Sequence, residues 1–282
     1  MNKVYLWQDE NIKTFSDRPS ITPMLLEGDE VRPAVLVIPG GGYYSVCEKI
    51  EGSPIARRFN ELGYHTFVLD YRTAATSNFY PAPQQDAMRA VKTIRANADK
   101  WHVDPTRIAV CGFSAGGHLA GSLGTICNRI NANDNNECDA FDHRPDVMIL
   151  CYGVLAFQPW SNIPTQINLI GEENMAAAEE YDLCKYVDDS TPPAFLFHTI
   201  KDQVVHYRNS LKFADAMAQA GRPCEMILYN WGEHGMLTGN DTLDISGWPE
   251  QAHRFMEVLQ QQKNDPESMD KYTHAYQANH LK

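Results

Sequence analysis

The chain has 282 residues, which is long enough for one large domain or two small ones. It carries 36 acidic and 24 basic residues, a net charge of −12, and no long run of Lys or Arg, so we expect neither nucleic acid nor a membrane as a partner. The N-terminus lacks the apolar stretch of a secretory signal, and no segment approaches the roughly 18 apolar residues of a membrane span, so we expect a cytoplasmic protein. The composition does not indicate an oligomeric state.

Short apolar runs rich in β-branched and aromatic residues predict buried strands of a parallel sheet. They span Ala34–Ile38, His65–Leu69, Arg107–Cys111, Val147–Tyr152, Ala194–Ile200 and Cys224–Tyr229. Segments with helical periodicity alternate with these runs and lie at Ser53–Gly63, around Ala87–Ala98, at Ser114–Leu123, at Arg208–Gly221 and at Pro249–Gln262. The alternation predicts an α/β domain with helices on both faces of a mostly parallel sheet and a site beyond the carboxyl ends of the strands.

Two of these helices allow a more specific expectation. In the helix from Ser53, that serine is the expected N-cap, Pro54 the first helical residue and Gly63 the stop signal. In the helix 208–221, we expect the stripe of Leu211, Ala214 and Ala218 to face the sheet.

No linker rich in Pro, Gly or Ser divides the chain, so we expect a single domain over residues 1–262. The segment 158–189 interrupts the alternation of strands and helices and is a candidate for a small lid over the site. Residues 263–282 form a polar tail. The seven cysteines are scattered without CxxC spacing, which indicates free thiols and no metal site.

The stretch "GFSAG" at residues 112–116 follows a predicted strand and precedes a predicted helix, which is the context of a nucleophile elbow. The serine of such an elbow sits on a sharp turn, and glycines two residues to either side remove collisions with neighbouring elements. Ser114 is therefore the candidate nucleophile. The amide of Ala115, at the start of the helix, is a candidate donor to the oxyanion of a reaction intermediate.

A serine nucleophile needs a base and an acid that orients the base. In folds with this elbow, the acid follows the serine in the chain and the histidine follows the acid. Asp202 lies just beyond the strand that starts at Ala194, and His234 lies just beyond the next strand. The sequence therefore predicts a triad of Ser114, Asp202 and His234.

Three consecutive glycines follow the strand that starts at Ala34, and they raise the alternatives of a phosphate site and an oxyanion site. A Walker loop requires Gly-Lys-Ser/Thr, but Gly42 is followed by Tyr43. A dinucleotide fingerprint requires a third glycine where the chain has Ser45. An esterase requires a second backbone amide from a loop after an early strand, and Gly41 or Gly42 can supply it.

These residues resemble the α/β-hydrolase superfamily, and within it the acetylxylan esterase-like carbohydrate esterases, which are distantly related to the hormone-sensitive lipase group. The resemblance covers about residues 34–248 and rests on "PGGGY", on Glu51-Gly52, on "DYR" at 70–72, on the elbow, and on "TPPAFLFHTIKDQVV" and "EHGM". The related lipases have a histidine before the three glycines, and Pro39 stands there in this chain.

The resemblance implies a serine hydrolase with the triad named above, no metal or other cofactor, and small acyl esters of sugars or polysaccharides as substrates. Acetylated xylan or xylooligosaccharide is the expected substrate. Tyr43, Trp160 and Trp231 adjoin predicted active-site loops or the lid segment and could offer aromatic faces to a sugar ring. The alternatives are a serine peptidase of the prolyl type, a non-catalytic homologue that binds a ligand, and, weakened by Tyr43 and Ser45, a nucleotide-binding protein.

Overall fold

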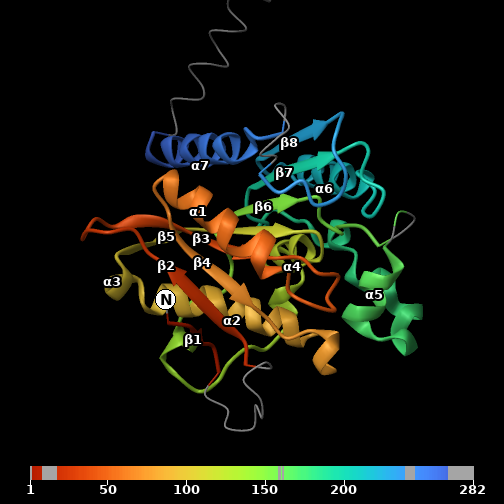
Figure 1. Cartoon of the computed structure of the whole chain (residues 1–282), viewed down its shortest axis with the longest axis horizontal. Helices are drawn as coiled ribbons and strands as arrows, with labels where there is room; N and C mark the ends of the chain where they lie inside the picture. The colour runs from red at the N-terminus through yellow and green to blue at the C-terminus, as the bar shows by residue number, and fades with distance from the viewer. Residues whose placement is uncertain (1, 8–17, 158–159, 161, 239–244, 266–282) are drawn as a thin grey trace, which may run out of the picture.

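The structure is a computed structural model that describes residues 2–7, 18–157, 160, 162–238 and 245–265. Eight strands form one sheet in the order β1-β2-β4-β3-β5-β6-β7-β8 (Figure 1). Their bounds are β1 Val4–Tyr5, β2 Ser20–Met24, β3 Arg32–Ile38, β4 His65–Asp70, β5 Val103–Phe113, β6 Val147–Cys151, β7 Ala194–Thr199 and β8 Cys224–Tyr229. The strands β3 to β8 pair with one another in parallel, and each of them coincides with an apolar run of the sequence.

The strands β1 and β2 were not predicted, and they pair antiparallel at the edge of the sheet. Pro23 weakens the strand signal of β2 because proline donates no hydrogen bond to a ladder. The structure tolerates it because β1 pairs with Ser20 and Ile21, so among the described residues only β4 pairs with β2 at Pro23.

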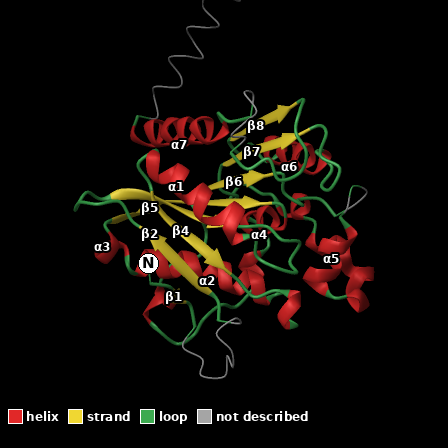
Figure 2. Cartoon of the chain, viewed as in Figure 1, coloured by secondary structure: helices red, strands yellow, loops and turns green. Residues whose placement is uncertain are grey.

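Helices cover both faces of the sheet (Figure 2). Their bounds are α1 Ser53–Glu61, α2 Ala82–Ala96, α3 Ala98–Trp101, α4 Ala115–Gly124, α5 Ile163–Ile170, α6 Arg208–Gln219 and α7 Trp248–Asn264. The helices α1 and α7 pack in one apolar cluster, and α2, α4 and α6 pack in another. Alternate residues of β3 divide between the two clusters, as expected for a strand buried on both faces. The α/β fold predicted from the sequence is confirmed.

The start of α1 differs slightly from the expectation. Gly52 occupies the N-cap position, and Ser53 is the first helical residue. The Ser53 hydroxyl donates its hydrogen bond to Glu48 rather than to the backbone of the helix. A short π-helical turn, Glu48–Gly52, runs directly into α1 and explains why no separate cap is needed.

The predicted buried stripe of α6 is wrong. Phe213 and Met217 are fully buried, whereas Leu211 is 42% exposed. Two polar side chains fix this orientation. Asn209 accepts a hydrogen bond from the Ala156 amide, and the Ser210 hydroxyl hydrogen-bonds a histidine of β7. Apolar periodicity could not reveal these polar anchors.

The segment 158–189 forms α5 and two 3-10 helices, Glu172–Tyr181 and Leu183–Tyr186, within its described part. The arrowheads of β6, β7 and β8 point toward the side of the molecule where α5 lies (Figure 1). α7 extends two residues beyond the predicted end at Gln262, and the rest of the predicted tail, from residue 266, lies outside the described residues. In the part of the chain that the structure describes, no helix is long and apolar enough to cross a membrane.

Candidate active site

Ser114 sits between β5 and α4 with φ 53° and ψ −118°, a conformation that is strained for a residue with a side chain. Both flanking glycines are required by close contacts. A Cβ atom at Gly112 would lie 2.1 Å from the carbonyl oxygen of Gly116, and one at Gly116 would lie 2.2 Å from the carbonyl oxygen of Ile38. The turn therefore has the geometry that a nucleophile elbow requires.

The structure brings the three residues of the predicted triad together. The Ser114 Oγ atom lies 2.9 Å from His234 Nε2, and His234 Nδ1 lies 2.7 Å from Asp202 Oδ2. Because a carboxylate only accepts, Nδ1 carries the proton and Nε2 is free to accept the hydrogen bond of the serine hydroxyl. Ser114 is 8% exposed and Asp202 5%, so water reaches this chain of hydrogen bonds only at its edge.

Asp202 is held by more groups than the histidine alone. Its Oδ1 atom accepts hydrogen bonds of 2.8 Å from the amides of Val204 and Val205. Burial raises the pKa of Asp202, but hydrogen bonds from His198, His234 and the Val205 amide outweigh burial and hold this pKa well below its usual range. The carboxylate is therefore ionised and can orient the imidazole of His234.

His198 is a supporting residue that the sequence did not identify. Its Nε2–H donates to the Val205 carbonyl at 2.8 Å and lies 3.4 Å from Asp202 Oδ2, while Nδ1 accepts from Ser210. The side chain is fully buried on β7. A histidine four residues before the candidate acid was the only sequence signal, and an apolar strand gives no reason to expect a polar role there.

The glycine loop lies directly against the elbow. A Cβ atom at Gly40 would be 2.7 Å from the Phe113 carbonyl oxygen and 3.0 Å from Ser114 Cβ. The Gly40 amide donates to Glu51. Gly41 and Gly42 have φ values of 124° and 63°, which favour glycine.

The three predicted oxyanion donors keep their amides available. Among the described residues, none accepts a hydrogen bond from the amides of Gly41 and Gly42. Ala115 is the first residue of α4, so its amide has no acceptor within the helix. The three predicted donors are thus compatible with an oxyanion site, and their role stays a prediction.

The prediction for Tyr43 is wrong, because its ring is fully buried and cannot offer a face to a sugar. Its φ of 57° turns the side chain inward, where the hydroxyl lies 2.9 Å from His118 Nδ1 on α4. Tyr43 thus anchors the glycine loop to the core. An aromatic residue next to a functional loop gives no sequence signal that separates an anchor from a binding surface.

The other two aromatic candidates remain predictions. Trp231 is 59% exposed on the loop that carries His234. Trp160 is half-buried and stacks on His206, with Arg208 5.4 Å above its ring.

The helix α5 contacts both loops of the site. Asn168 donates a 2.8 Å hydrogen bond to the carbonyl of Gly42, and Asn162, at the N-cap of α5, donates one of 2.9 Å to the carbonyl of Val204. α5 therefore connects the glycine loop to the loop of the acid, which is the position predicted for a lid segment. Its opening or closing stays a prediction.

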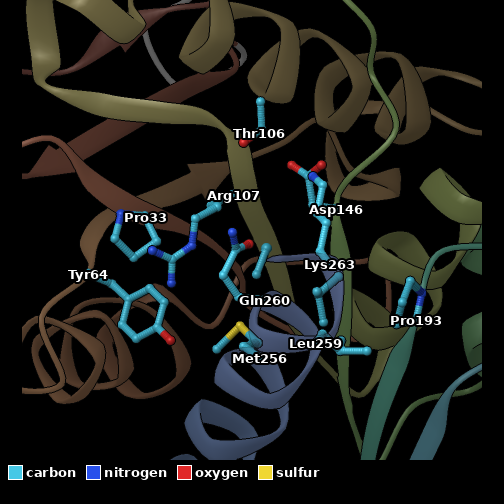
Figure 3. A pocket seen from close by; sticks show the side chains of 12 residues that line it. Pro33, Tyr64, Thr106, Arg107, Asp146, Pro193, Met256, Leu259, Gln260 and Lys263 are labelled. Carbon is cyan, nitrogen blue, oxygen red and sulfur yellow. The ribbon is translucent and has the colours of Figure 1, made fainter. Parts of the chain in front are cut away.

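Figure 3 shows the side chains that line a separate pocket, which has a volume of about 200 Å³. It is lined by residues at the amino ends of β3, β5 and β6 and by α7. Two of its charged groups have partners within the protein: Arg107 pairs with Glu257, and Asp146 pairs with Arg95. Sites of open α/β sheets lie at the carboxyl ends of the strands, so we assign the candidate site to Ser114 and not to this pocket.

Comparison with known proteins identifies the family of the chain. Residues 25–217 match the model of the BD-FAE family. The chain belongs to the BD-FAE family. It is 34% identical over 249 residues to endo-1,4-beta-xylanase B of Butyrivibrio fibrisolvens, covering 86% of this chain and 39% of that protein. It is 28% identical over 228 residues to the acetylxylan esterase of Xylanibacter ruminicola, covering 76% of this chain and 45% of that protein.

This BD-FAE chain thus spans less than half the length of these two relatives. Among solved structures, it is similar to an acetyl ester-xyloside bifunctional hydrolase from Caldicellulosiruptor lactoaceticus, with a TM-score of 0.85, 32% identity and coverage of 92% of this chain and 96% of that one. The carboxylesterase Cest-2923 from Lactobacillus plantarum gives a TM-score of 0.74 at 25% identity, with 92% and 98% covered. These relatives confirm the resemblance to acetylxylan esterase-like α/β-hydrolases.

Proposed function

We propose that the chain is a serine esterase that hydrolyses small acyl esters, above all acetyl esters, through an acyl-enzyme. The observation that carries this proposal is the continuous hydrogen-bonded chain from Asp202 through His234 to Ser114. The amides of Gly41, Gly42 and Ala115 beside it support the proposal further, because an oxyanion needs such donors.

In the proposed acylation, His234 Nε2 takes the proton of Ser114 as Oγ attacks the acyl carbon of the ester. The carbonyl oxygen becomes an oxyanion that accepts hydrogen bonds from the loop amides and from Ala115. His234, whose positive charge is stabilised by Asp202, then gives its proton to the leaving alcohol as the ester C–O bond breaks. The products of this half-reaction are the free alcohol and the acyl-Ser114 ester.

In the proposed deacylation, His234 takes a proton from water, and the resulting hydroxide attacks the acyl carbon. The bond to Ser114 Oγ breaks, and His234 returns the proton to that oxygen. The carboxylic acid leaves, and the serine regains its hydroxyl. Each proton passes through Nε2, which faces the serine in the structure.

For the alcohol part of the substrate we propose a carbohydrate, such as acetylated xylan or xylooligosaccharide. This part rests on the names of the relatives, an acetylxylan esterase and an acetyl ester-xyloside hydrolase. The exposed ring of Trp231 and the half-buried ring of Trp160 are the aromatic surfaces proposed to contact the sugar.

A panel of esters tests the proposal. We expect release of acetate from acetylated xylooligosaccharide and from p-nitrophenyl acetate, and we expect rates to fall as the acyl chain lengthens. A fluorophosphonate probe should label the protein at Ser114, as located by peptide mass spectrometry. Cleavage of a proline amide faster than the acetyl esters would instead favour a peptidase, and absence of both labelling and hydrolysis would favour a non-catalytic binding protein.

A further inference from the structure

Glu51 is a buried carboxylate next to the candidate site that the proposed mechanism does not use. It is 5% exposed and lies in the π-helical turn before α1. Its Oε2 atom accepts a 2.7 Å hydrogen bond from the Gly40 amide, and its Oε1 atom accepts one of 3.0 Å from the Tyr152 hydroxyl. The carboxylate thus joins the glycine loop after β3 to the segment after β6, on either side of the elbow.

No basic side chain neutralises this carboxylate. Within the described residues, no nitrogen of Lys, Arg or His lies within the 4.0 Å of an ion pair with Glu51. Burial raises the pKa of Glu51 above its ordinary value, and the Gly40 amide, the Tyr152 hydroxyl and His234 offset this rise only in part. Burying a carboxylate without a cationic partner costs free energy of folding. Such groups are found mainly where they serve a function.

Tyr152 connects Glu51 to the candidate base. Its ring packs against the imidazole of His234 with the centroids 5.0 Å apart and an angle of 69° between the planes. Its φ of 39° is rare for a bulky residue, and a hydrogen bond of 2.8 Å from its amide to the Phe197 carbonyl holds it in place. The strained backbone therefore presents the hydroxyl to Glu51 and the ring to His234.

We propose that Glu51 is a positioning residue of the esterase, which fixes the glycine loop through Gly40 and supports His234 through Tyr152. This inference rests on the proposed serine esterase function. With its own amide bound to Glu51, Gly40 holds the start of the loop, so the next two amides, of Gly41 and Gly42, can face the oxyanion. The negative charge also favours the imidazolium that forms when His234 takes the proton of Ser114.

Other titratable groups also face the carboxylate of Glu51. They are Cys47 on its own segment, Tyr71 after β4, Cys151 and Tyr152 around the end of β6, and His234. Burial raises the pKa of each thiol and phenol in this set, so these groups stay neutral in the working range of an esterase. A pH effect of Glu51 is therefore expected through His234.

The test compares four variants on p-nitrophenyl acetate, with active sites counted by fluorophosphonate. Glu51→Gln removes the charge but keeps the shape, and Tyr152→Phe removes only the bridging hydroxyl. Glu48→Gln is the matched control, because Glu48 is an exposed glutamate of the same turn. Ser114→Ala is the reference for the proposed function.

We expect Glu51→Gln to lower kcat by about 10- to 100-fold with little change in KM, and Tyr152→Phe to lower kcat by a smaller factor. In Glu51→Gln, the acid limb of the kcat/KM profile should move to lower pH, because the charge that favours the imidazolium is gone. Glu48→Gln should match the wild type in kcat, in KM and in the pH profile of kcat/KM. A merely structural role would lower the number of active sites and leave kcat per site and the pH profile unchanged.

Wild-type kcat per site and an unshifted pH profile in Glu51→Gln would overturn the inference. Should that variant fail to fold, Tyr152→Phe tests the link from Glu51 to His234, because it removes only the hydroxyl that joins them. Wild-type kcat per site in Tyr152→Phe would then overturn the inference. A Ser114→Ala variant that still hydrolyses the ester would sink the proposed function itself. An inactive Ser114→Ala beside a fully active Glu51→Gln would overturn the role of Glu51 alone.

Discussion

The Nε2 atom of His234 lies 2.9 Å from the Oγ atom of Ser114, so the imidazole can accept the hydroxyl proton without rearrangement. We therefore expect Ser114→Ala to lower kcat for p-nitrophenyl acetate by at least about 1,000-fold. Ser122→Ala is the matched control. Ser122 lies on α4, the helix that follows Ser114, and its hydroxyl donates a hydrogen bond to the Leu119 carbonyl. Steady-state kinetics measure both, and a Ser114→Ala enzyme with more than a tenth of the wild-type rate would show that another group is the nucleophile.

Asp202→Asn should leave the protein folded but nearly inactive. The side chain can still accept the amide hydrogen bonds of Val204 and Val205, but an amide cannot stabilise the imidazolium of His234 as a carboxylate does. We expect kcat to fall by about 1,000- to 10,000-fold, with the melting temperature close to that of the wild type. Asp189→Asn, at an exposed aspartate before β7, is the control and should keep full activity. An unchanged kcat in Asp202→Asn would move the role of the acid elsewhere.

Gly40→Ala should damage the site through a steric collision. The added methyl group would lie 2.7 Å from the Phe113 carbonyl oxygen and 2.8 Å from Glu51 Oε2, so either the glycine loop or the elbow must shift. We expect a loss of about 1–3 kcal/mol in the free energy of unfolding and at least a tenfold loss of kcat.

Gly247→Ala is a suitable control for this substitution, because among the described residues its methyl group would meet only the Gln251 side chain, at 3.8 Å. Urea unfolding and kinetics on both variants compare the two effects. A Gly40→Ala variant as stable and active as Gly247→Ala would mean that the loop has room that the structure does not show.

The parts of the site that the sequence predicted are those with a local signal. The elbow needs glycines at fixed positions around Ser114, and the acid and base follow strands whose apolar runs are clear. Such signals lie within a few residues of the functional side chain. The order of strands then brings Asp202 and His234 to Ser114, because parallel neighbours end at the same edge.

The parts that the sequence missed depend on contacts between distant segments. Tyr43 is an anchor because it reaches His118, which lies 75 residues later in the chain. Glu51 is a site residue because it meets Tyr152, 101 residues away. Neither partner can be inferred from spacing or periodicity, and the same holds for the polar residues that set the orientation of α6. In the sequence, Glu51 belongs to a motif of the family resemblance, but no functional role could be predicted for it.

His118 carries a pH dependence of stability that is separate from catalysis. Its Nε2–H donates to the Tyr181 carbonyl at 3.0 Å, and its Nδ1 lies 2.9 Å from the Tyr43 hydroxyl, from which it accepts. Burial lowers the pKa of His118 to about 4. In the unfolded chain, a histidine has a pKa of about 6.5.

The unfolded chain therefore binds a proton at a pH where the folded chain does not. The contribution of the neutral, buried His118 to the free energy of unfolding is fully present above about pH 6.5. It is lost as the pH falls toward 4. A lowering of this size corresponds to about 3 kcal/mol in the free energy of unfolding. The side chain is fully buried, so solvent screening does not reduce this figure.

We expect His118→Gln to be less stable than the wild type at pH 7, because its contacts are changed, but to lose less stability on acidification. Urea unfolding of both proteins between pH 7 and about pH 4 measures the two curves, and groups common to both cancel in their difference. If the His118→Gln curve runs parallel to the wild type, His118 takes up no proton on unfolding, and the acid sensitivity must come from other groups.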